Sequence, residues 1–233
     1  MLRRLGRSGL LDGPAGVLFL ALLAGFAGLG AAVHAEAGPV TRLDLGLGEE
    51  LRDHRDASPL ARQVFLAVTG LGSAATLTAV VAAAAVGSLW ARRRSLAALW
   101  VIADLGAWGL ITGLKDLFGR HRPPFLDPGV VERSLSFPSG HALGSIVVYG
   151  LLAALLARHA ARPWLRRAAL VLLGGLILAI AFSRVYLGAH YLTDVLGGLC
   201  CGGAWLAACL ASWNGRKGRR VSPGAVPPPH PAG

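Results

Sequence analysis

The stretch SRVYLGAHYLTD, at residues 183–194, holds an arginine, a histidine and an aspartate between two apolar segments. His190 and Asp194 are four residues apart, which is the spacing at which two side chains share one face of a helix. The Asp194 carboxylate can therefore accept a hydrogen bond from one imidazole nitrogen and leave the other nitrogen as a lone pair. An oriented neutral imidazole of this kind is typical of a nucleophile or a general base.

A second group of residues predicts a site for an anion. Ser139, Gly140 and His141 stand where a helix is expected to begin, and the N–H groups of a helix N-terminus bind anions. Gly140 lets the backbone approach a ligand closely, and His141 can donate a proton to a leaving oxygen. Cations join this set from the ends of other predicted helices: Lys115, Arg122 and Arg184. Donors and cations around one point suit a tetrahedral dianion such as phosphate.

The elements that must position these residues are predicted to be membrane-spanning helices. Of the 233 residues, 54% are hydrophobic and 15% are charged, and six apolar segments reach the length of about 20 residues that a bilayer requires. Backbone polar groups find no partner in lipid, so we expect an all-α polytopic membrane protein. The expected spans are residues 14–35, 60–89, 95–114, 139–157, 168–187 and 190–213. The second is long, which indicates a tilt or an extension beyond the lipid.

The basic residues predict the orientation of these helices. The net charge of +11 comes from short clusters between apolar segments rather than from a basic face with interleaved aromatic residues, so nucleic acid is not an expected partner. Every second connection is basic, and the other connections carry most of the acids. The positive-inside rule then places both termini in the cytoplasm of a plasma-membrane protein and the ionisable cluster on its extracytoplasmic side. The basic clusters fall within residues 3–7, 92–94, 158–167 and 216–220.

The domain plan that follows is a single six-helix unit over residues 1–213. Residues 214–233 are basic and rich in proline and glycine, and we expect a disordered cytoplasmic tail. The first apolar segment is long for a signal peptide, so we favour a retained helix over a cleavable leader. Leucines at positions 43, 47 and 51 fit a short amphipathic helix over residues 41–57 on the outer surface, with a solvated linker as the alternative.

Small residues within the apolar segments are assigned to packing. The cysteines lack the spacing of a metal site and are interpreted as packing residues: Cys200, Cys201 and Cys209. Glycines on two segments predict faces for close helix contacts: Gly174, Gly175, Gly197, Gly198, Gly202 and Gly203.

Three ionisable residues lie outside these assignments. Asp104 lies about 16 Å along a helix from Lys115, where it could pair with another helix or stay protonated. Arg120 and His121 are expected to face solvent, with contact to a lipid headgroup as the alternative.

Three sequence blocks give the chain a resemblance to a known family. Residues 115–123 (KDLFGRHRP) match K-x6-R-P, residues 138–141 match P-S-G-H, and residues 183–194 match S-R-x5-H-x3-D. In this order they resemble the signature of the type-2 phosphatidic acid phosphatase superfamily, over a core from about residue 60 to residue 213. Lipid phosphatases, glucose-6-phosphatase and vanadium haloperoxidases share this site.

The resemblance implies a role for each signature residue. His190 would attack phosphorus and form a phosphohistidine, Asp194 would hold its ring, and His141 would protonate the departing group. The other signature residues would stabilise the phosphoryl oxygens in the transition state: Lys115, Arg122, Ser139, Gly140 and Arg184. The resemblance also implies that no metal or other cofactor is needed, which agrees with a site that shows one obvious carboxylate.

The function expected from these observations is that of an integral-membrane phosphatase acting on a lipid phosphate or diphosphate. Undecaprenyl diphosphate, phosphatidic acid and phosphatidylglycerol phosphate are the candidate substrates. A lipid or anion transporter could use the same basic pocket, but it would not require the pair of His190 and Asp194. Six spans disfavour a vanadate-dependent peroxidase, and a small-molecule phosphatase would need a wider watery pocket. The sequence leaves the oligomeric state open.

Overall fold

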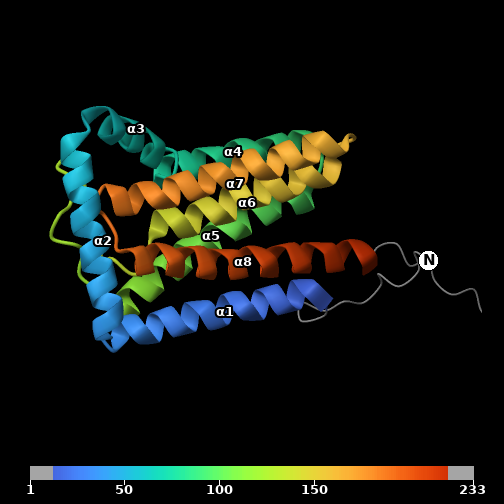
Figure 1. Cartoon of the computed structure of the whole chain (residues 1–233). Coiled ribbons are helices and arrows are strands. Elements are labelled where there is room, and N and C mark those ends of the chain that lie inside the picture. The colour runs from blue at the N-terminus through green and yellow to red at the C-terminus, as the bar shows by residue number, and fades with distance from the viewer. Residues whose placement is uncertain (1–12, 220–233) are drawn as a thin grey trace, which may run out of the picture.

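The computed structural model describes residues 13–219, which form eight helices and no strands within that range. Figure 1 shows most of them running side by side, with α2 lying across one end. The bounds of the helices are α1 Gly13–His34, α2 Gly38–Ala57, α3 Pro59–Gly70, α4 Ala74–Trp90, α5 Arg94–Phe118, α6 Gly140–His159, α7 Pro163–Tyr186 and α8 Leu192–Arg219.

Five of these helices are long and apolar enough to cross a membrane, and the pair α3 and α4 provides a sixth crossing if it forms one span. Large apolar side chains cover their outer surfaces. Val171 and Leu172 on α7, for example, leave 71% of their surface uncovered, which is unfavourable in water and favourable in lipid. The prediction of an all-α multi-pass membrane protein is confirmed.

The second predicted span is broken rather than continuous. α3 and α4 are bent by 43° at a short break, where Ser73 caps α4 by accepting a hydrogen bond from the N–H of Thr76. Tyr149 on α6 donates to the carbonyl of Leu71 inside the break, at 2.7 Å. Hydropathy does not predict the break, because the segments on both sides of it are apolar. The break is fixed by a helix cap and by a tertiary hydrogen bond.

The predicted helix over residues 41–57 is present as α2, and two of its three predicted leucines, Leu47 and Leu51, pack against the core. Leu43 is 57% exposed, whereas Asp44 and Arg55 are buried against the rest of the molecule. The inward face of α2 is therefore partly polar, and its acid and its base both reach the segments that carry the predicted site.

α6 is the central helix of the core and packs against both α7 and α8. The predicted glycine face of α8 permits this contact, because a Cβ on Gly198 would lie only 2.6 Å from the carbonyl oxygen of Ser139. Gly174 and Gly175 on α7 have no atom within 4 Å of an added Cβ, so the packing role predicted for them is wrong. Cys201 and Cys209 are buried free thiols in α8, in agreement with their packing assignment.

Both ends of the described chain lie at the end of the bundle opposite α2, together with the connections α4–α5 and α6–α7 (Figure 1). α8 continues to Arg219, so the first residues of the predicted tail are helical. The rest of that tail, residues 220–233, and the basic cluster at residues 3–7 lie outside the described residues.

Candidate active site

The turn between α7 and α8 carries His190. Within this turn Gly188 adopts a φ of +65°, and a Cβ there would lie 2.2 Å from the carbonyl oxygen of Phe125. Only glycine fits this combination of a left-handed backbone and a close approach. The N–H of His190 donates to the carbonyl of Arg184 at 3.1 Å, so the end of α7 fixes the backbone that positions the imidazole.

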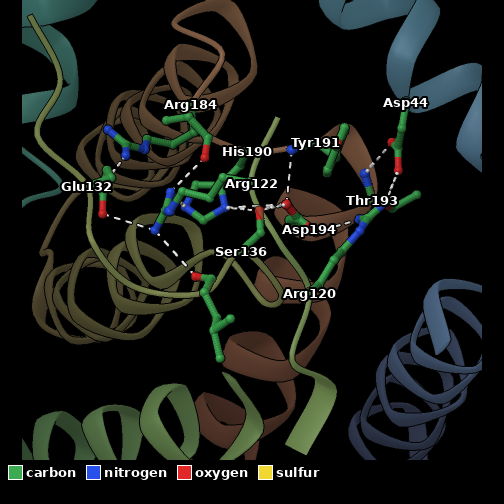
Figure 2. Close-up of polar contacts among 12 residues, drawn as sticks. Asp44, Arg120, Arg122, Glu132, Ser136, Arg184, His190, Tyr191, Thr193 and Asp194 are labelled. Carbon is green, nitrogen blue, oxygen red and sulfur yellow. Dashed lines mark hydrogen bonds and ion pairs between the residues drawn. The ribbon is translucent and has the colours of Figure 1, made fainter. Parts of the chain in front are cut away.

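Asp194 lies in the first turn of α8 and faces one edge of the His190 ring. Its Oδ2 is 3.4 Å from Nδ1 of His190 and accepts the N–H of Tyr191 at 3.0 Å, as the acidic residue of a capping box does. The hydroxyl of Ser136 donates to the same oxygen and lies 3.3 Å from Nδ1. On the opposite edge, Nε2 of His190 is 3.2 Å from Nη1 of Arg122. The acid and the cation therefore lie on opposite sides of the imidazole (Figure 2).

The protonation state of His190 follows from this environment. Burial lowers the pKa of His190 to about 4, and the hydrogen bond with Asp194 offsets part of the effect. The imidazole is therefore neutral at neutral pH. With Asp194 on the Nδ1 side, the ring proton belongs on Nδ1 and the lone pair on Nε2.

Arg122 belongs to a group of cations and donors that we call the cationic cup: Lys115, Arg122, Arg184, Ser139 and the N-terminus of α6. Arg184 is 1% exposed, and its Nη1 donates to the hydroxyl of Thr69 at 2.7 Å. Burial lowers the pKa of the Arg122 guanidinium, which marks it as a desolvated cation. Arg184 Nε and Ser139 Oγ are buried and have no hydrogen-bond partner within residues 13–219. A cup with two unpaired donors suits an anion with several oxygens.

The start of α6 completes the cup. Ser139 is the N-cap residue of α6, and its N–H donates to the carbonyl of Asp194 at 3.0 Å, which joins the start of α6 to α8. His141, in the first turn of α6, lines the same cavity as His190. The structure thus brings all eight predicted site residues together at one end of the bundle.

A cavity of about 530 Å³ extends from the two histidines along one face of α5. The α5 residues that line it follow the helical repeat and lie on one side of the helix: Asp104, Ala107, Trp108, Ile111, Thr112, Lys115 and Asp116. Asp104 makes no hydrogen bond or ion pair to another of the described residues. Of the two alternatives predicted for Asp104, pairing with another helix is therefore not observed. Gly140 borders the cavity, and a Cβ there would be 3.4 Å from Ile111.

Arg120 is 16% exposed, so the prediction that it faces solvent is wrong. Its Nη1 donates to Asp194 at 2.6 Å and to Thr193 at 2.8 Å, while its Nη2 donates to Asp44 at 2.8 Å. The N–H of Thr193 donates to Asp44 as well, at 3.1 Å. We call Asp194, Arg120, Thr193 and Asp44 the rear network, because it lies behind His190 as seen from the cup (Figure 2). His121 is exposed, as predicted.

Sequence reasoning missed two residues of this site, Glu132 and Ser136. Both come from the loop between α5 and α6, and neither belongs to a signature position. Glu132 accepts from Arg184 and, at 3.0 Å, from Nη2 of Arg122, so the expectation of one carboxylate at the site is wrong. Within residues 13–219, no three side chains of His, Cys, Asp or Glu are grouped so that they could hold a metal.

Comparison with known proteins assigns the sequence that carries this site to a family. The sequence model of the PAP2 superfamily matches residues 95–217, which include all three blocks. The chain belongs to the PAP2 superfamily. This PAP2 protein is 33% identical to phosphatidylglycerophosphatase B of Bacillus subtilis (strain 168) over 148 residues, which are 62% of this chain and 71% of that protein.

A solved structure agrees with the fold of this PAP2 protein. It is the crystal structure of the first transmembrane PAP2 type phosphatidylglycerolphosphate phosphatase from Bacillus subtilis, with a TM-score of 0.76 and 29% identity. The similarity covers 88% of this chain and 98% of that chain. The resemblance predicted from the three blocks is confirmed, and the PAP2 protein is a membrane lipid phosphatase, a hydrolase.

Proposed function

We propose that this PAP2 protein removes phosphate from a lipid phosphate or diphosphate through a phosphohistidine on His190, without a metal ion. The observation that supports it most is the orientation of His190 between Asp194 and Arg122. A binding pocket needs the cations, but it has no use for a buried neutral imidazole whose lone pair faces them.

The proposed reaction has two steps. Nε2 of His190 attacks phosphorus, the bond between phosphorus and the lipid oxygen breaks, and His141 gives a proton to that oxygen. Water then attacks the phosphohistidine, His141 takes a proton from it, and inorganic phosphate leaves. Arg122, Arg184 and Lys115 stabilise the equatorial oxygens in both transition states, because the cup is preorganised and partly desolvated.

The cavity along α5 supports a lipid substrate. Both histidines line one end of the cavity. Its walls include Ala107, Trp108 and Ile111, and these apolar side chains suit an acyl or prenyl chain that enters from the membrane. Phosphatidylglycerol phosphate is the first candidate, because both relatives are named for it, followed by phosphatidic acid and undecaprenyl diphosphate. Apolar walls of this kind do not distinguish among these chains.

We further propose that the site faces the extracytoplasmic side of the plasma membrane. The basic connections at residues 92–94 and 158–167 lie at the end of the bundle opposite the site (Figure 1), and the positive-inside rule assigns that end, with both termini, to the cytoplasm. α1 belongs to the same functional unit in this proposal, since Phe26 on α1 stacks on Phe137, next to the start of α6.

The test is a phosphate-release assay on the purified protein in detergent with EDTA, over a panel of lipid phosphates. We expect activity without metal, and a loss of several orders of magnitude in His190→Ala and in His141→Ala. His121→Ala is the matched control, because His121 is exposed and occupies a variable position of the first block. Substantial turnover by His190→Ala would rule out His190 as the nucleophile.

A further inference from the structure

The carboxylate of Glu132 lies inside the cationic cup. One of its oxygens accepts from Arg184, and the other accepts from Nη2 of Arg122 at 3.0 Å. Its Oε1 is also 4.0 Å from Nδ1 of His141. Glu132 therefore contacts two of the groups that the proposed function assigns to the phosphate (Figure 2). It also lies near His141, the group assigned to the leaving oxygen.

A carboxylate satisfies this cup only in part. It offers two oxygens in a plane and one negative charge, whereas a bound phosphate offers three oxygens around phosphorus and up to two charges. Arg184 Nε and Ser139 Oγ remain without partners within the described chain although Glu132 is in place. A tetrahedral dianion can use donors that Glu132 leaves unused.

The segment around Glu132 is held by hydrogen bonds from side chains rather than between backbone groups. Within the described part of the chain, residues 131–135 make no hydrogen bond between backbone groups, and the neighbours Val131 and Arg133 are exposed. Lys115 and Arg122 instead hold Ser134, at 2.8 Å and 2.6 Å, and Lys115 also donates to the carbonyl of Leu135 at 2.6 Å. Glu132 can therefore leave the cup by a local movement of its side chain and loop, without unfolding a helix.

Glu132 and a substrate phosphate cannot occupy the cup together at low energy, because two anions would then share the same two guanidinium groups. We propose that Glu132 is a displaceable substitute for the substrate phosphate. The incoming phosphate displaces it, and its return to Arg122 and Arg184 after hydrolysis promotes release of inorganic phosphate. This inference rests on the proposed function and adds a residue that sets the affinity of the site for anions.

The test is the exchange Glu132→Gln in the full-length protein in detergent, with inorganic phosphate and orthovanadate as the probes. We expect the dissociation constant of inorganic phosphate, measured by calorimetry and by inhibition of turnover, to fall by roughly tenfold or more, because a like charge at contact distance is removed. The KM should fall in the same direction, while kcat does not rise because phosphate leaves more slowly.

Asp116→Asn is the matched control. Asp116 lines the same cavity, is exposed and has no hydrogen bond to either arginine, so the exchange removes the same charge outside the cup. Its effect on phosphate affinity should be much smaller, because solvent screens an exposed charge. Glu132→Asp is the second variant. It keeps the charge with a shorter reach, and phosphate affinity should lie between that of the wild type and that of Glu132→Gln.

Unchanged or weaker phosphate binding in Glu132→Gln would overturn the inference, and a fall in kcat with unchanged phosphate affinity would make Glu132 a partner of His141 instead. If the folded wild type and the variants bind neither phosphate nor orthovanadate, the proposed function itself fails. If the wild type binds both probes and Glu132→Gln does not bind phosphate more tightly, only this inference fails.

Discussion

Arginines are paired with carboxylates on both sides of His190, but the two groups of pairs differ in burial and in hydrogen bonding. In the rear network the carboxylates of Asp44 and Asp194 are 0% exposed, and both are bonded to Arg120. In the cup, the carboxylate of Glu132 is 17% exposed and accepts from Arg122 and Arg184. The cup also retains unpaired donors, whereas the guanidinium and both carboxylates of the rear network are bonded.

The difference lies in the backbone that carries each acid. Asp44 and Asp194 are on helices α2 and α8, so their positions are fixed by helical backbone and by burial. Glu132 is on a loop whose neighbouring residues face outward. An arginine paired with fixed acids positions a catalytic group, and an arginine paired with a displaceable acid remains able to bind substrate. Variants of the two sides should therefore behave differently.

The largest effect is expected for Asp194→Ala in the rear network. Without the carboxylate, nothing equivalent holds the Nδ1 proton of His190, and we expect turnover to fall by roughly a thousandfold or more, as for the acid of other catalytic triads. The measurement is single-turnover phosphate release with labelled lipid phosphate. A loss of less than about tenfold would show that Ser136 alone can orient the ring.

A smaller loss is expected for Arg120→Gln. Arg120 does not face the cup, so it acts as a positioning residue through Asp194, and we expect turnover to fall by about ten- to a hundredfold, the usual effect of removing a supporting group. Phosphate affinity should not increase, in contrast to Glu132→Gln. Arg120→Lys should recover only part of the activity, because one ammonium cannot reproduce the fork to Asp44 and Asp194.

A merely structural role for Arg120 would lower the melting temperature in parallel with turnover. The positioning role instead predicts a loss of turnover in protein whose melting temperature is close to that of the wild type. His121→Gln, in the next residue of the same loop, is the control for the loop itself.

The smallest change is expected in the pH dependence between pH 7 and pH 5. His190 must be neutral to attack phosphorus, and its lowered pKa of about 4 keeps it neutral throughout this range. With an aryl phosphate whose leaving group needs no proton from His141, single-turnover formation of the phosphoenzyme should therefore stay nearly constant down to about pH 5 and fall as the pH approaches 4, where the His190 imidazole gains a proton. A decline centred near pH 6.5, the ordinary value for histidine, would show that the burial of His190 does not control its protonation.

The sequence predicted the spans and the signature residues because both depend on local patterns. Apolar length indicates a span, and the spacing of His190 and Asp194 predicted their contact, although His190 lies in the turn before α8 rather than on the helix. The break between α3 and α4 and the polar inward face of α2 depend on contacts with distant helices, which no local pattern encodes. The role of Arg120 also depends on a distant contact, because its partner Asp44 is 76 positions away in the chain.

Glu132 shows where sequence reasoning reaches its limit. In the sequence it is one of several acids in an outward-facing connection, and nothing local separates it from Asp116. Only the path of the loop turns its side chain toward Arg122 and Arg184 while the neighbouring side chains face outward. Loop side chains at a site are therefore the part that a sequence pattern predicts least well.

The central claim is that Nε2 of His190 becomes covalently bonded to phosphorus. The most direct measurement is rapid quenching of the detergent-purified protein with lipid labelled in its phosphate, followed by peptide mapping at alkaline pH. The account predicts an acid-labile, alkali-stable phosphoryl group on the peptide that contains His190, absent in His190→Ala. A phosphoryl group on another residue, or turnover with no protein-bound phosphate at any time point, would contradict it.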